Sequence, residues 1–125
     1  MTIRYLLAVL IVTISCTTDQ SRAQDAVAVS PDIYTVLFEN DAIRILELTY
    51  EPGERDAVHS HPRYTIVTKQ GGTLRIYAEG NDPRDADMQV DQPLLLDPVK
   101  AHWAENIGDT TVRVIAVEFK GLTSN

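Results

Sequence analysis

Residues 53–72 read GERDAVHSHPRYTIVTKQGG, and the stretch places His59 and His61 one residue apart, ahead of a run rich in β-branched and aromatic residues. In an extended segment, side chains at i and i+2 project from the same face, about 6 to 7 Å apart along the chain. Two such imidazoles can converge on one ion, and an antiparallel neighbour can bring the third histidine, His102, to the same point. The pattern predicts a three-imidazole metal site; the alternative from the pair alone is surface histidines beside a turn.

Short runs of β-branched and aromatic residues follow one another along the chain, separated by turn residues such as Pro52-Gly53 and Gly71-Gly72. No window of helical length has apolar residues at helical spacing. The strand-like runs are 34–38, 42–50, 64–68, 73–78, 88–90, 94–96 and 111–119. We therefore expect an all-β sandwich or barrel.

Two stretches refine this expectation. In 111–119, Glu118 shares a face with alternating apolar residues, which favours a place for its carboxylate in a wet cavity. The acidic stretch 79–91 lacks the ligand spacing of a calcium loop, so we expect it to be a solvated hairpin loop.

Composition limits the possible partners. The chain has 125 residues, a formal net charge of −7 and a pI near 4.8, which suit one acidic domain and exclude nucleic acid as a partner because a polyanion would be repelled. A single cysteine, Cys16, excludes an intrachain disulfide, a thiolate zinc site and an iron–sulfur cluster. Any metal must therefore be held by nitrogen or oxygen.

The N-terminus has the layout of a secretory signal: Arg4 precedes an apolar run over 5–15 that is too short to span a bilayer. Cleavage after Ala23 would make residues 1–23 a signal peptide and export the domain to the periplasm or cell envelope. The alternative is a lipoprotein anchored at Cys16, because residues 12–16 resemble a bacterial lipobox. Membrane contact is expected only through one of these two routes.

The histidine pair belongs to a longer pattern. Gly53, five residues, His59-Ser60-His61 and then Gly72 stand at the spacing of the first motif of the cupin superfamily, which this chain resembles. We expect Gly53 and Gly72 to be turn glycines with positive φ. His102 and Asn106 match the end of the second cupin motif, although Pro98 stands four rather than five residues before the histidine.

The resemblance covers about 38–120 and implies an all-β, small jelly-roll barrel over 37–125, preceded by an N-terminal extension over 24–36. It also implies one divalent ion, zinc, iron, nickel or manganese, held at the barrel mouth by His59, His61 and His102. Small exported cupins of this pattern include those associated with β-alanine degradation and dioxygenase-like families.

One departure from the cupin pattern concerns the glutamate of the first motif, which is due where Thr65 or Ile66 stands and is missing. The usual shell of three histidines and one carboxylate is thereby reduced to three histidines, which suits an anionic substrate and weakens affinity for hard ions such as manganese. An inward Glu47 or Glu118 would restore a carboxylate from another strand.

Two classes of function follow. The first is a metal-dependent enzyme of dioxygenase, isomerase or lyase type acting on a small polar or carboxylate-bearing molecule. The second is a non-enzymatic metal- or ligand-binding module of the cell envelope. An enzyme needs a general acid or base in the cavity, for which the candidates are Glu47, Glu105 and Glu118. The apolar strands near each end favour a homodimer.

Overall fold

The computed structural model describes residues 24–121. One short helix and nine strands form within this range. In chain order they are α1 (Ala26–Val29), β1 (Tyr34–Glu39), β2 (Ile43–Tyr50), β3 (His59–His61), β4 (Tyr64–Gln70), β5 (Thr73–Ala78), β6 (Arg84–Asp87), β7 (Pro93–Leu96), β8 (Val99–Asn106) and β9 (Val112–Phe119).

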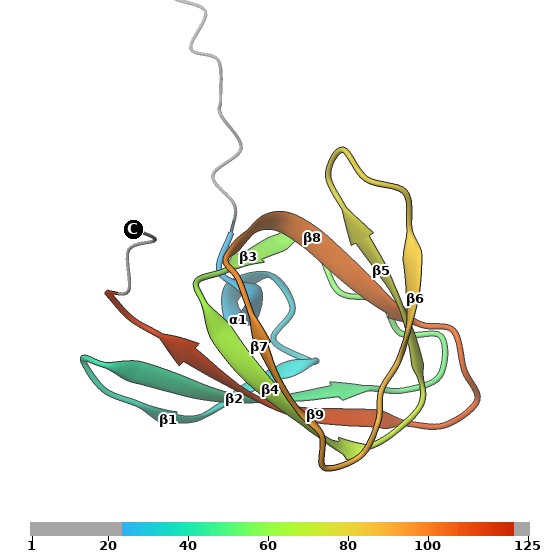
Figure 1. The fold of residues 1–125 in the computed structure, drawn as a ribbon, viewed down its shortest axis with the longest axis horizontal. Coiled ribbons are helices and arrows are strands. Elements are labelled where there is room, and N and C mark those ends of the chain that lie inside the picture. The colour runs from blue at the N-terminus through green and yellow to red at the C-terminus, as the bar shows by residue number, and fades with distance from the viewer. Residues whose placement is uncertain (1–23, 122–125) are drawn as a thin grey trace, which may run out of the picture.

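The strands form two antiparallel sheets that face each other across a common interior (Figure 1). The first sheet has the order β1-β2-β9-β4-β7 and the second has the order β3-β8-β5-β6. From β2 onward the chain passes repeatedly from one sheet to the other, which is the connectivity of a jelly roll. The predicted all-β jelly-roll barrel is therefore confirmed.

The core lies between the sheets and follows the two-residue period of the strands. On β2 the inward residues Leu46, Leu48 and Tyr50 are buried, and on β9 Val112, Val114 and Ala116 lie on the same side. Removing a side chain from such a core, as in Leu46→Ala, costs about 2 to 5 kcal/mol of stability. The alternation predicted for 111–119 is confirmed, and it brings Glu118 to the interior with an exposed fraction of 2%.

The stretch 79–91 differs from the expected hairpin loop because it contains β6. The sequence of β6 is RDAD, and its pairing with β5 is supported by an outward ion pair between Arg75 and Asp85 at 2.7 Å. Three charged residues in four hide such a strand from a hydrophobic pattern. The run 88–90, expected as a strand, makes only an isolated bridge between Val90 and Thr68, while Met88 is buried.

β8 was also absent from the predicted strands. Its inward residues are His102, Ala104 and Asn106, which alternate with half-buried or exposed neighbours. The inward face thus carries two polar side chains and one small one, so it lacks the apolar signal of a strand. β8 is stabilised as a strand by its pairing with β5 on one side and β3 on the other, which the sequence pattern does not show.

The segment 24–36, expected as an extension, packs onto the barrel. Asp25 caps α1 by accepting from the backbone N–H groups of Val27 and Ala28, and Ala26, Ile33 and Tyr34 are buried. The predictions of a signal peptide over 1–23, cleavage after Ala23 and a lipid on Cys16 lie outside the described residues. Between residues 24 and 121, no helix is long and apolar enough to cross a membrane.

The two motif glycines have different structural roles. Gly53 has a φ of +81°, as expected for a turn glycine. Gly72 does not have a positive φ; instead a Cβ there would lie 2.7 Å from Cγ2 of Val112. The second glycine is therefore required by close packing of the β4–β5 turn against β9.

Candidate metal centre

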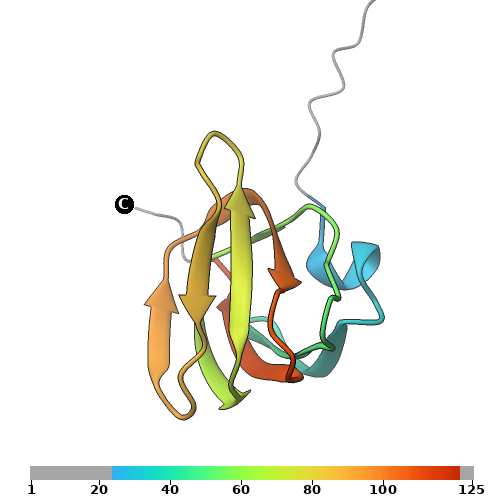
Figure 2. The same ribbon diagram turned by 90° about the vertical axis from the view of Figure 1, so that its right-hand side faces the viewer.

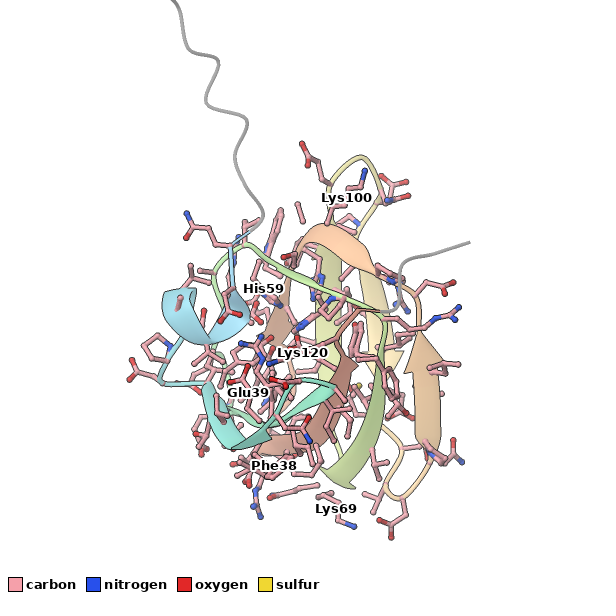
Figure 3. All side chains as sticks on the ribbon, turned by 90° about the vertical axis from the view of Figure 1, so that its left-hand side faces the viewer. Phe38, Glu39, His59, Lys69, Lys100 and Lys120 are labelled. Atoms are coloured by element: carbon pink, nitrogen blue, oxygen red, sulfur yellow. The ribbon has the colours of Figure 1, made fainter. Side chains whose placement is uncertain are left out.

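The three histidines meet inside the barrel. β3 carries His59 and His61, and its register with β8 places His102 directly opposite His59. All three side chains are buried, and one ring nitrogen from each lies within 4.8 Å of the others. Figure 3 shows His59 within the barrel, whereas Phe38 lies at its outer edge. The convergence predicted from the histidine spacing is thus present.

Hydrogen bonds fix the tautomers of two of the rings. Nδ1 of His59 lies 2.7 Å from the carbonyl oxygen of Ala57, and Nδ1 of His61 lies 2.6 Å from Oε1 of Glu118. A carbonyl and a carboxylate only accept, so each Nδ1 carries the proton and each Nε2 carries a lone pair. The two Nε2 atoms are 3.0 Å apart, an arrangement that needs a proton or a cation between them.

His102 completes the set as a neutral ring. Burial, together with the neighbouring His59 and His61, lowers the pKa of His102 to about 3, and burial also lowers the pKa of His59. Its Nδ1 is buried with no hydrogen-bond partner among residues 24–121. Neutral imidazoles are the ligand form of histidine. Three buried nitrogen donors, one with an unpartnered nitrogen, therefore fit a divalent ion of the zinc, iron or nickel type.

A chain of hydrogen bonds and ion pairs extends from His61 through Glu118 and Arg44 to Asp25. Glu118 accepts from His61 through Oε1 and from Nε of Arg44 through Oε2 at 2.7 Å, and Nη1 of Arg44 lies 2.6 Å from Asp25. Burial alone would raise the pKa of Glu118, but the hydrogen bonds from His61 and Arg44 outweigh it and hold the pKa below its usual value. A carboxylate on Nδ1 orients a histidine ligand and raises its basicity.

A second buried carboxylate, that of Asp56, holds the chain segment that leads into β3. Asp56 accepts from the hydroxyls of Tyr34 and Tyr50 at 2.7 and 2.6 Å and from the backbone N–H of Ala104 at 2.6 Å. The Tyr34 hydroxyl also lies 3.1 Å from Nε2 of His59. Burial raises the pKa of both tyrosines well above the usual value, so they stay protonated and act as donors. The cluster fixes the chain just before His59.

An interior cavity of about 330 Å³ opens beside the histidines. Two of the imidazoles line it, and most of the remaining wall is apolar. The polar and charged lining residues include His61, His102, Tyr34, Tyr64, Arg84 and Asp97, and the apolar wall includes Ile66 and Ile76. The volume lies within the range of small-molecule sites.

Comparison with solved structures identifies the architecture. A cupin domain from Bordetella pertussis superposes with a TM-score of 0.67 at 21% identity, over 71% of this chain and 93% of that one. A double-stranded β-helix protein from Klebsiella pneumoniae gives a TM-score of 0.59 at 19% identity, over 74% and 79%. An RmlC-like cupin from Methanocaldococcus jannaschii gives 0.59 at 12%, over 70% and 78%. The chain has the cupin fold.

Sequence comparison adds no closer relationship, since no protein-family model and no curated protein matches the chain. At identities of 21% or less, these solved cupins establish the fold. Any chemistry of this chain therefore depends on its own residues.

The three predicted carboxylates occupy different places in the cupin barrel. Glu118 lies behind His61. Glu47 faces outward from β2, where it pairs with Arg113, and Glu105 accepts from the hydroxyl of Tyr77 at 3.2 Å. Neither Glu47 nor Glu105 lines the cavity. Only Glu118 reaches the histidines, and its oxygens are taken by His61 and Arg44.

The place of the missing motif glutamate is also resolved. Thr65 is directed away from the cavity, because its hydroxyl donates to the carbonyl oxygen of Leu94 at 2.9 Å, whereas Ile66 is buried and lines the cavity. Of the two positions at which the motif glutamate was expected, Ile66 therefore faces the cavity and Thr65 does not. The carboxylate near the histidines comes from β9, where Glu118 lies opposite Tyr64.

Sequence reasoning did not find several residues of the site. Tyr34 and Asp56 carry no motif, and their pairing depends on bringing together residues 22 positions apart. Arg84 lies in a strand with charged neighbours and gives no local signal of facing inward. For Arg44, the sequence does carry a signal, because it alternates in phase with the buried Leu46 on β2.

Proposed function

We propose that this cupin binds one divalent metal ion through His59, His61 and His102 and presents it to a small molecule in the barrel cavity. The observation that carries the proposal is the pair of Nε2 lone pairs 3.0 Å apart, with both Nδ1 atoms committed to other acceptors. A cation removes that repulsion, and one ring nitrogen of His102 lies within 4.8 Å of a ring nitrogen of each of the other two histidines.

The donor set supports zinc, iron or nickel over manganese, because three imidazoles without a carboxylate ligand are a poor site for a hard ion. A bound ion would supply Lewis acidity for isomerase or lyase chemistry, and iron in particular would supply the redox chemistry of a dioxygenase. The chain's own residues provide apolar walls, which exclude water. They also provide the hydroxyl of Tyr34, which lies beside His59.

Metal content tests this proposal. Elemental analysis of protein purified without chelator and reloaded with zinc should find close to one ion per chain, and His61→Ala should lose it. Ile66→Ala is the matched control, since it also truncates a cavity wall but removes no donor. Circular dichroism verifies that both variants are folded. Equal metal content in His61→Ala and the wild type would refute the site.

A second function, a non-enzymatic metal- or ligand-binding module, is favoured by one observation. Asp97 is the one carboxylate that lines the cavity among the described residues, and it is paired with Arg63 at 2.8 Å. A general acid or base is therefore left to tyrosine or histidine. A time course of proton NMR spectra with zinc-loaded or iron-loaded protein and small carboxylates separates the two: new product signals indicate an enzyme, and shifted ligand signals alone indicate a module.

We also propose export and homodimerisation. Gln24 and Asp25 already contact the barrel, since the carbonyl of Gln24 accepts from Ser60 N–H and Asp25 pairs with Arg44. Processing at Ala23 or at Cys16 would keep both contacts. The edge strand β1 supports a dimer because Leu37 and Phe38 are half exposed on it.

A further inference from the structure

Arg84 belongs to the inner face of the barrel although it lies on a charged strand. The register of β6 with β5 places Arg84 opposite Ile76, which lines the cavity. The next pair, Asp85 and Arg75, forms the outward ion pair. Because residues opposite each other share a face, Arg84 points to the cavity side. Figure 2 shows β5 and β6 side by side, with their connecting turn extending beyond the barrel.

The guanidinium of Arg84 has no carboxylate partner within residues 24–121. Its neighbour Asp85 is paired with Arg75, and Asp97, the acidic residue of the cavity lining, is paired with Arg63. A cation at a cavity that is lined mainly by apolar groups, with the nearby acids already paired, favours an anion from solution.

Tyr64 lines the same cavity as Arg84. Its ring packs on His61 with centroids 4.7 Å apart, and its hydroxyl makes no hydrogen bond within the described part of the chain. Tyr64 therefore offers a hydroxyl donor to the cavity that Arg84 and His61 also line.

We propose that Arg84 and the Tyr64 hydroxyl bind the carboxylate of the cavity's ligand, so that the ligand is a small carboxylic acid with an apolar body. This inference rests on the proposed function, because it names the class of small molecule that the barrel accepts. The apolar wall, including Ile66 and Ile76, takes the body of the ligand.

Charge makes Arg84 decisive for such a ligand. The chain has a net charge of −7, so its overall field repels anions, and a local guanidinium must outweigh that repulsion. A guanidinium offers parallel N–H donors that match a carboxylate, and such charge-assisted bonds are stronger than neutral ones. The cavity of about 330 Å³ accommodates a benzoate-sized molecule.

The test compares benzoate with benzamide, which has nearly the same shape and no charge. Isothermal titration with zinc-loaded protein should show benzoate binding roughly tenfold or more tightly than benzamide. Arg84→Gln should remove that preference, Arg84→Lys should retain part of it, and Tyr64→Phe should reduce it. Arg75→Gln, on the outer face of the same hairpin, should leave it unchanged.

Two results would overturn the inference. One is a benzoate preference that persists in Arg84→Gln but disappears on removing zinc, which would place the carboxylate on the metal. The other is no benzoate preference in the folded, zinc-loaded wild type. Zinc affinity measured on the same variants keeps the proposals separate, because loss of the metal site would show as absent zinc binding irrespective of benzoate.

Discussion

Oε1 of Glu118 lies 2.6 Å from Nδ1 of His61, and both side chains are buried. The two residues are far apart in sequence and meet because β9 and β3 lie on facing sheets. The contact makes the His61 ring present the lone pair of Nε2 to the other histidines. The first cupin motif lacks its glutamate, but the carboxylate of Glu118 on β9 acts on the site through His61.

Glu118→Gln should weaken metal binding. Glutamine leaves His61 with a neutral partner and leaves Arg44 without its buried anion, so zinc affinity should fall roughly 10- to 100-fold. Competition against a chromophoric chelator measures the change. Glu47→Gln, an outward carboxylate on β2, serves as control. Equal zinc affinities in the two variants would contradict a role for Glu118 in orienting His61.

Asp56→Asn should destabilise the barrel. The carboxylate of Asp56 accepts from Tyr34, Tyr50 and Ala104 N–H, and an amide has one acceptor oxygen and brings two donors of its own. We expect a loss of about 3 kcal/mol in the free energy of unfolding, measured by urea denaturation. Asp85→Asn, at an exposed ion pair, should change it far less, because solvent screens the pair. A loss in Asp56→Asn no larger than in the control would show that the buried cluster contributes little.

The metal-free protein should lose stability as pH falls below about 6.5. The folded state holds the pKa of His102 at about 3, below the unfolded value, so the unfolded state binds a proton that the folded state does not. Its stabilising contribution is complete above the unfolded pKa and is lost progressively toward pH 3.

Thermal unfolding between pH 7 and pH 4 measures this dependence. Each unmatched proton changes stability by up to about 1.4 kcal/mol per pH unit. His102→Gln removes the titrating group and should flatten the slope. An equally steep slope in that variant would assign the acid sensitivity to other groups.

The sequence predicts the position of a side chain when that position follows from residues close to it in the chain. His59 and His61 share a face by strand periodicity alone, and the inward side of Glu118 follows from alternation with Val114 and Ala116. His102 needed the family motif, because β8 has too few apolar residues to be recognised as a strand.

Contacts between segments that are far apart in the chain could not be predicted from the sequence. Asp56 meets Tyr34 across 22 positions, and Arg84 is directed inward only by its register with Ile76. The strand β6 itself is stabilised by pairing and by the Arg75–Asp85 ion pair rather than by local propensity. Thr65, a candidate from motif spacing, and Glu47, a candidate from another strand, are both directed outward by the pleat of their strands.

The proposed dimer should depend on β1. Leu37→Lys introduces a charge on this edge strand, where the wild-type side chain is 51% exposed, and should yield a monomer at micromolar concentration. Multi-angle light scattering of the wild type should give twice the chain mass. Leu95→Lys, on the other edge strand β7, should stay dimeric. A monomeric wild type would contradict the dimer, and a monomer only in Leu95→Lys would place the interface at β7.

Anomalous scattering from zinc-soaked crystals shows whether His59, His61 and His102 hold one metal ion. We expect one strong peak near the zinc edge, about 2.0 to 2.1 Å from one ring nitrogen of each histidine. Two results would contradict the three-histidine site. One is zinc bound at full occupancy elsewhere in the crystal with no peak among the three rings, and the other is a peak that contacts only one ring.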